Sequence, residues 1–301
     1  MRTRPATFAA DASSALEQLG FPCRVAASTV GTAGDGGAGS DDDCFGMYAV
    51  RTIRGGEPIV VERPFAMTIS QGARHQRCAV CLKDSRSRGS HAWSMLCPGC
   101  SRVRFCSTSC AAVAEASFHP RGGVECVALN AVQDDSALTF DTADTTMQAI
   151  RILALRAAGT PVQVVGGRSF GSDVARGLRV GYDAYETRLS HSCAPSSREV
   201  TARIRTAAAI ALRAVPSAAR VSPVELRALL ERHASNLFGL NGPGGLDIAS
   251  ASFVGFAHLF NHSCAPNAVL DVDGRWMDDA TQAMPSFALV ALRAIERGEQ
   301  V

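Results

Sequence analysis

Long apolar stretches are missing from this sequence. No run approaches the roughly 20 residues that a helix needs to cross a bilayer, so we predict no membrane span. A secretory signal is also missing, because Met1 to Ala10 contains arginines but no apolar stretch of about 7–15 residues. The formal net charge is only +2, too small for a field that favours nucleic acid or an anionic membrane. We therefore expect a protein or peptide partner, and a chain that is a monomer.

Cysteine is abundant but unevenly placed. The chain has 11 cysteines, an odd number, and most lie between Cys78 and Cys126 with CxxC spacings. This distribution favours metal ligation over disulfides, and a reducing compartment, the cytoplasm or the nucleus, fits it best. An organellar transit peptide stays open as an alternative, because Arg2 and Arg4 precede a stretch rich in Ala and Ser, although Asp11 counts against it.

The first part of the chain, residues 1–44, is predicted to be a flexible segment. Ala27 to Asp43 consists mainly of small residues and glycines with an acidic end, and it offers almost nothing to bury. Hydrophobic residues make up 47% of the whole chain, which is enough for a sizeable core elsewhere. We expect ordered structure to begin at Phe45.

Two segments far apart in the sequence share one pattern. Residues 48–64 carry β-branched residues on both sides of Gly55-Gly56, and residues 287–301 run apolar residues into a turn at Gly298-Glu299. Such a pattern is typical of strand, turn and strand. We predict a two-stranded hairpin at each place.

The middle of the chain is predicted to be mostly helical. Thr145 to Ala158 places its apolar residues mostly on one helical face. A second helix should begin after Ser222, because a serine cap, Pro223 at the first helical position and Glu225 together make a capping box. Pro161 to Gly181 shows no clear period and supports no assignment.

Eight residues have the types and spacings of zinc ligands. Zinc prefers four soft or borderline ligands in a tetrahedron, and a CxxC turn lets two thiolates reach one ion. Eight ligands make two structural sites with no open position for water, and binding would supply on the order of 10 kcal/mol of folding free energy per site. The predicted ligands are Cys78, Cys81, Cys97, Cys100, Cys106, Cys110, His119 and Cys126.

This window resembles the MYND zinc finger, and the match includes an aromatic-Cys-Ser signature at residues 105–107. In that family the sites interleave, which implies one ion on Cys78, Cys81, Cys106 and Cys110 and the other on Cys97, Cys100, His119 and Cys126. The spacing between the last two ligands is longer than is usual in the family, as is the gap from Cys81 to Cys97. His91 is therefore kept as an alternative ligand.

A second resemblance concerns Asn261 to Asn267, with the sequence NHSCAPN, which follows an apolar stretch. It is similar to the signature of SET-domain lysine methyltransferases. Together with the inserted finger, it resembles the SET- and MYND-domain (SMYD) family from about Phe45 to Val301. In that family the Asn and His hold S-adenosylmethionine, and the following Pro and Asn help to form a knot-like crossing of the chain.

The resemblance implies a set of cofactor-binding residues. Two weaker matches add to the NHSCAPN segment: CFGMYA at 44–49 resembles a loop whose backbone approaches the cofactor, and NLFGL at 236–240 resembles a segment whose Asn contacts it. Asn236 has an alternative role as a helix cap. The predicted residues are Gly46, Met47, Tyr48, Asn236, Asn261 and His262.

The implied fold is α+β, with small SET-type sheets that are split by a two-zinc MYND finger and a helical insert. The expected parts follow one another along the chain: a flexible segment at 1–44, SET at 45–77, the finger at 78–126, the helical insert at 127–235, and an incomplete SET part at 236–301. A second HSCAP sequence at 191–195 falls in the insert and receives no function.

The implied activity is methyl transfer from S-adenosylmethionine to a protein lysine, on a histone or another protein. The family's orienting tyrosine should follow the position of Val301, so the catalytic residue stays unknown, and we expect residues 1–301 alone to turn over near background. Cys264 lacks the three later cysteines that share its zinc in the family, and Tyr182 and Tyr185 are expected to be packing residues. The alternative is a noncatalytic adaptor whose finger binds a proline-rich peptide.

Overall fold

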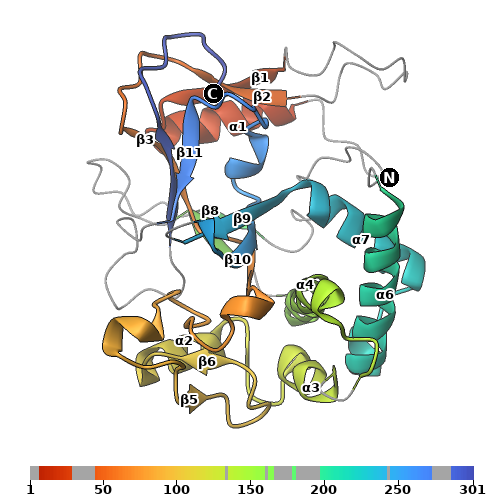
Figure 1. Cartoon of the computed structure of the whole chain (residues 1–301). Coiled ribbons are helices and arrows are strands. Elements are labelled where there is room, and N and C mark those ends of the chain that lie inside the picture. Colours follow the sequence, from red (N-terminus) through yellow and green to blue (C-terminus); the bar gives the residue numbers. More distant parts are fainter. Residues whose placement is uncertain are drawn as a thin grey trace.

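The computed structural model describes residues 7–28, 45–132, 135–159, 162–165, 178–180, 197–242, 245–272 and 286–301. It combines helices with small antiparallel sheets, which confirms the predicted α+β class (Figure 1). Among the described residues, no helix is long and apolar enough to cross a membrane. Several predictions fall outside the described residues: the linker beyond Ser28, Cys44, the second HSCAP sequence, Tyr182 and Tyr185.

The sheets bring together parts of the chain that lie far apart in the sequence. One three-stranded sheet has the order β4-β10-β9 and another the order β11-β12-β3, so strands that precede the cysteine-rich window pair with strands near the end. The two-stranded sheets are β1-β2, β5-β6 and β7-β8. The strand bounds are β1 Cys23–Ala27, β2 Phe45–Ala49, β3 Pro58–Glu62, β4 Ala66–Ile69, β5 Met95–Leu96, β6 Arg104–Phe105, β7 Val162–Val165, β8 Leu178–Val180, β9 Leu237–Asn241, β10 Asp247–Ser252, β11 Ala268–Asp271 and β12 Phe287–Ala291.

The two predicted hairpins are wrong in their pairing, although their turns are present. Gly56 and Gly298 adopt φ values of +80° and +85°, which glycine reaches without strain. The strands beside them pair with the other segment instead: β3 pairs with β12, Ile53 bridges Ile295, and the Val301 N–H donates to the Met47 carbonyl at 2.9 Å. The local pattern predicts a strand, but the choice of partner depends on long-range burial that the pattern does not contain.

The prediction of a flexible segment up to residue 44 is wrong for residues 8–27. Helix α1, Phe8–Gln18, packs beside β1, and β1 pairs with β2 along its whole length. Apolar side chains provide the burial: Leu16 is fully buried, and the Phe21 ring meets the Phe256 ring edge-on at 6.1 Å. The stretch of small residues after Ser28 lacks such groups.

Helices α3, α4, α6 and α7 lie together on one side of the molecule (Figure 1). Helix α4, Phe140–Ala158, contains the predicted helical segment and begins earlier, because Thr139 and Thr142 form a capping box. Helix α7, Pro223–Ser235, begins as predicted, with its Ser222 hydroxyl accepting the Glu225 N–H at 3.1 Å. The Glu225 carboxylate pairs with Arg156 at 2.6 Å. The other α-helices are α2 Thr108–Ala116, α3 Val124–Ala131 and α6 Arg198–Ala214, which packs on α4 and α7.

A buried carboxylate fixes the segment that leads to the NHSCAPN motif. Glu62, at the end of β3, is 1% exposed and accepts the N–H groups of Gly255, Phe256 and Ala257 at 2.6 to 2.8 Å. Charge-assisted hydrogen bonds of this kind are the strong ones. They hold the turn before residues 257–259, a short 3-10 helix, and so place Asn261.

Replacing Gly255 by alanine should destabilise the chain by about 1–3 kcal/mol, the usual cost of overpacking. A Cβ atom there would lie 2.8 Å from the Glu62 carboxylate, which is fixed by its three hydrogen bonds. Gly239→Ala is the matched control, because a Cβ atom at Gly239 meets nothing within 4 Å. Urea unfolding of both variants measures the difference, and equal stabilities would contradict the role given to Glu62.

Candidate functional site: two metal-ligand groups and an amide cluster

The first group of thiols joins the start of the predicted finger to residues that follow the β5-β6 hairpin. Cys78 and Cys81 precede the β5-β6 hairpin, Cys106 follows it, and Cys110 lies in the first turns of α2. The Ser107 hydroxyl caps α2 by accepting the Cys110 N–H at 3.2 Å, which fixes the last thiol. The Cys106 sulfur lies 3.4 Å from that of Cys81 and 3.6 Å from that of Cys110. All four ligand atoms lie within 4.8 Å of one another.

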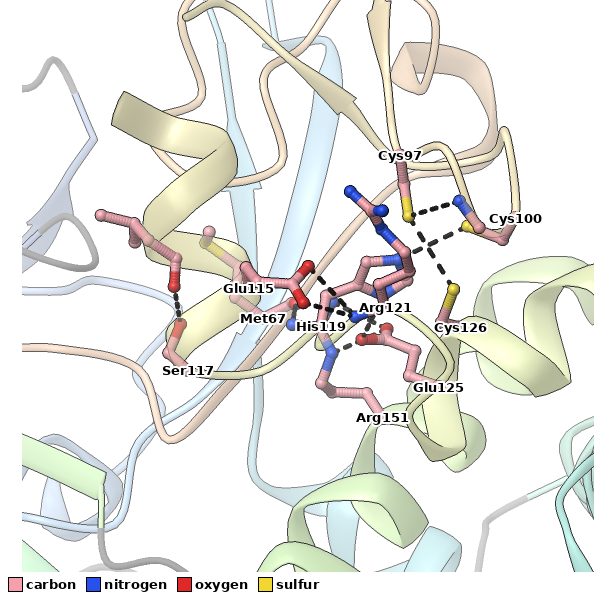
Figure 2. Close-up of polar contacts among 12 residues, drawn as sticks. Met67, Cys97, Cys100, Glu115, Ser117, His119, Arg121, Glu125, Cys126 and Arg151 are labelled. Carbon is pink, nitrogen blue, oxygen red and sulfur yellow. Dashed lines mark hydrogen bonds and ion pairs between the residues drawn. The ribbon is translucent and has the colours of Figure 1, made fainter. Parts of the chain in front are cut away.

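The second group is buried on every side. Cys97 and Cys100 flank a turn after β5, Cys126 lies on α3, and His119 stands in the loop before α3 (Figure 2). The Cys97 and Cys126 sulfurs are 3.8 Å apart, and the Cys100 sulfur lies 3.4 Å from His119 Nε2. The grouping of the eight residues is the one that the resemblance implied.

His91 lies outside both groups. It is exposed, and His119 takes the place beside Cys100. The unusually long spacing from His119 to Cys126 is absorbed by a turn in which Gly122 has a φ of +73°. Glu115 accepts the Arg121 N–H with both carboxylate oxygens at 3.1 Å (Figure 2).

The two groups fit zinc both in the distances between their ligand atoms and in their donor chemistry. A Zn–S bond of about 2.3 Å gives a tetrahedron whose sulfurs are about 3.8 Å apart, close to the separations observed. Hydrogen bonds from Cys78 and Cys81 lower the pKa of the Cys110 thiol, while hydrogen bonds with Cys110 and Cys78 raise the pKa of the Cys81 thiol. Four thiols this close therefore ionise together only beside a cation. Each group can hold a zinc ion.

Gly99 allows the turn of the second group to close. A Cβ atom at this position would lie 2.6 Å from the Cys126 sulfur, so a larger residue would push that ligand away. The Gly99 N–H also donates to the Cys97 sulfur at 3.4 Å. Such a bond stabilises a thiolate.

A buried chain of charges ties His119 to the rest of the fold. His119 Nδ1 lies 3.1 Å from a Glu125 oxygen, and the other Glu125 oxygen accepts the Arg151 Nε–H at 2.8 Å (Figure 2). Arg151, on α4, also donates to the Met67 carbonyl of β4 at 2.6 Å and lies 4.1 Å from the centre of the Phe118 ring. A carboxylate behind a metal-binding histidine fixes the ring orientation and the tautomer.

Glu125 stays ionised in this place. Burial alone would raise the pKa of its carboxyl group, but the charge of Arg151 and the hydrogen bond to His119 outweigh burial and lower it. Sequence reasoning missed both Glu125 and Arg151. The one local signal was an acidic residue next to a predicted ligand, and nothing in the sequence indicated that Arg151 lies beside it.

A cluster of amides forms where β2 meets the end of the chain. Asn261 donates from Nδ2 to the Ser28 hydroxyl at 2.9 Å and to the Phe45 carbonyl at 3.2 Å. The Tyr48 hydroxyl lies 2.9 Å from the Ala27 carbonyl and 3.1 Å from Gln300 Oε1. Ser28 and Gln300 were not predicted to take part; Ser28 follows β1, which pairs with β2, and Gln300 bridges Tyr48.

Gly46 lies beneath these amides. A Cβ atom on Gly46 would lie 2.6 Å from Gln300 Nε2 and 3.2 Å from Asn261 Nδ2, so only glycine lets both amides come so close. Asn267 helps to fix the segment that carries Gln300, because Asn267 Nδ2 donates to the Gln300 carbonyl at 2.8 Å. Three predicted residues, Gly46, Tyr48 and Asn261, thus meet at one place.

The other three predicted cofactor residues are placed differently. Met47 has a fully buried side chain in the core, so only its backbone could face a ligand. Asn236 ends helix α7 and donates from Nδ2 to the Arg232 carbonyl at 2.8 Å, which is the capping role considered as its alternative. His262 is exposed, with its Nε2 3.7 Å from the Cys264 sulfur.

Comparison with known proteins adds one finding. Residues 232–301 match the family model of the SET domain, and this stretch contains Asn236, Asn261 and His262. The match supports a SET-domain protein, a class whose members are generally protein lysine methyltransferases. A search of curated proteins found no match.

Proposed function

We propose that this chain, whose residues 232–301 match the SET domain, is an S-adenosylmethionine-dependent protein-lysine methyltransferase of SET-and-MYND architecture. The observation that carries the proposal is the meeting of Gly46, Tyr48 and Asn261 across more than two hundred residues of sequence. The SET match supports the reaction class, and the two ligand groups support the inserted finger with one structural zinc in each.

The amide cluster has groups suited to such a cofactor. S-adenosylmethionine carries an amine and a carboxylate, and an asparagine amide has two donors and one acceptor. Because Asn261 Nδ2 already donates to Ser28 and Phe45, the Asn261 Oδ1 is the group that would accept from the cofactor amine. The Asn261 side chain is exposed, so its remaining hydrogen-bonding capacity is accessible to a ligand. His262, next in the chain and also exposed, offers a ring that can pack on an adenine. The fixed backbone around Gly46 would hold Asn261 in place.

The chemistry of the reaction sets what the protein must do. When bound, the cofactor supplies an electrophilic methyl group, which a neutral lysine amine takes up with loss of a proton. Because a free lysine amine has a pKa near 10.4, the site must desolvate the amine and align it. The residues of the amide cluster would orient the methyl donor.

The alternative is a noncatalytic adaptor in which the finger binds a proline-rich peptide and the SET part is scaffold. Both hypotheses use the two zinc ions. They differ in the cofactor, because an adaptor has no need of S-adenosylmethionine.

Titration calorimetry of the zinc-loaded chain with S-adenosylmethionine tests the enzyme hypothesis. We expect binding, and we expect Asn261→Ala to weaken it by about tenfold or more, because a hydrogen bond to a charged ligand group contributes about 1.5–3 kcal/mol. Asn241→Ala, at an exposed asparagine on β9, is the control and should bind like the parent chain. No binding by the folded parent chain would favour the adaptor.

A further inference from the structure

A cavity of about 220 Å³ lies between the finger and the helices, away from the amide cluster. Its walls come from Ser101 to Arg104 of the finger, from β4 and the 3-10 turn that follows it, and from α3 and α4. None of the predicted zinc ligands or cofactor residues lines it. The proposed function gives it no role.

The floor of this cavity is apolar. Leu129, Leu138 and Met147 line it, and concave apolar surfaces of this kind are typical of ligand sites. Phe140 is 72% exposed and lies seven residues before Met147, so the two share one face of α4. An apolar side chain of an occupant would pack on Leu129, Leu138 and Met147.

The rim of the cavity is rich in arginine. Five guanidinium groups line it, and three of them pair with carboxylates: Arg74 with Asp144, Arg77 with Asp84 and Arg151 with Glu125. Arg104 donates to the Trp93 carbonyl, and the guanidinium of exposed Arg102 has no hydrogen bond or ion pair to any described residue. The rim therefore carries more positive than negative charge.

Two further observations indicate a missing anionic partner with a hydrogen-bond donor. Burial lowers the pKa of Arg74; Asp144 raises it, while the like charge of Arg102 lowers it further. The Gln71 side chain lines the same cavity, and its Oε1 is buried without a hydrogen-bond partner in the described part of the chain. A buried acceptor without a hydrogen bond destabilises the protein, and a donor from a bound partner would remove that cost.

We propose that this cavity binds a short peptide segment of a partner protein in which an acidic residue stands next to a large apolar residue. The carboxylate would pair with Arg102 and Arg74, since arginine forks match carboxylates. The apolar side chain would lie on the floor near Met147, and a peptide N–H would donate to Gln71 Oε1. A proline-rich segment without an acidic residue leaves the Arg102 guanidinium unpaired, and a nucleic-acid backbone leaves the apolar floor unfilled.

The test is selection from a random heptapeptide library displayed on phage against the zinc-loaded whole chain. We expect sequences with Asp or Glu beside an apolar residue. Fluorescence anisotropy of the best peptide should show affinity about tenfold lower or more with Arg102→Glu, and a similar loss when its acidic residue becomes an amide. Arg205→Glu, at an exposed arginine of α6 outside the cavity, is the matched control.

Three outcomes would overturn the proposal: no enrichment, enrichment of proline-rich sequences without acids, or peptide affinity unchanged by Arg102→Glu. Binding of a 20-base-pair DNA that Arg102→Glu abolishes, without acidic peptides in the selection, would assign the rim to nucleic acid instead. Arg102→Glu should leave S-adenosylmethionine binding unchanged. Failure of the peptide proposal can therefore be distinguished from failure of the methyltransferase proposal.

Discussion

Replacing Cys100 by serine is expected to lower the unfolding midpoint of the whole chain, whereas Cys106→Ser should open only its own part of the finger. Each variant should hold one zinc ion where the parent chain holds two, as elemental analysis of dialysed protein would show. We expect this difference because the second group is connected to α4 and β4 through His119, Glu125 and Arg151. Metal binding of this kind contributes folding free energy directly.

Circular dichroism melts and limited proteolysis separate the two variants. For Cys106→Ser we expect cuts confined to residues 78–126 and a nearly unchanged melt of the helices. For Cys100→Ser we expect cuts to spread into α4. The same local damage in both variants would show that the second group is no more coupled to the core than the first.

Replacing Glu125 by alanine should cost about 3–5 kcal/mol, because removal of one partner of a buried ion pair leaves the other charge uncompensated. Arg151 is only 5% exposed, and in this variant it would keep the Met67 carbonyl and the Phe118 ring as contacts. His119 would also lose the acceptor for its Nδ1–H. Urea unfolding at fixed zinc concentration measures the loss.

The double variant Glu125→Ala, Arg151→Met distinguishes a buried charge from simple loss of packing. Removing both charges should recover much of the stability, since a buried pair can be replaced by apolar residues at little cost. The interaction free energy from this double-mutant cycle should exceed about 1 kcal/mol. Additive losses would mean that the two residues act independently.

Local chemistry was readable from the sequence, and long-range pairing was not. The cysteine spacings predicted two ligand groups, and Ser222 predicted the start of α7, because both depend on residues close together in the chain. The pairing of β3 with β12, and the bridge from Tyr48 of β2 to Gln300, join segments more than two hundred residues apart. Residues 8–27 were missed because the poor burial of the following linker was extended back over them.

The candidate cofactor site likewise contains residues that local motifs indicated and residues that only long-range contacts bring in. Gly46 and Asn261 were indicated by motifs, whereas Gln300 and Ser28 enter through contacts between segments that are far apart in the sequence. Asn236 shows the converse, because an asparagine after a helix fits a motif and a cap equally well until its hydrogen bond to Arg232 is seen.

The measurement that tests the central claim most directly is ultraviolet cross-linking of tritiated S-adenosylmethionine to the zinc-loaded chain, followed by digestion and location of the label. The proposed site predicts label in peptides that contain residues 45–49 or 261–267, and loss of that label in Asn261→Ala. Label confined to peptides of the arginine-rimmed cavity, or no label on a folded chain that holds two zinc ions, would contradict it.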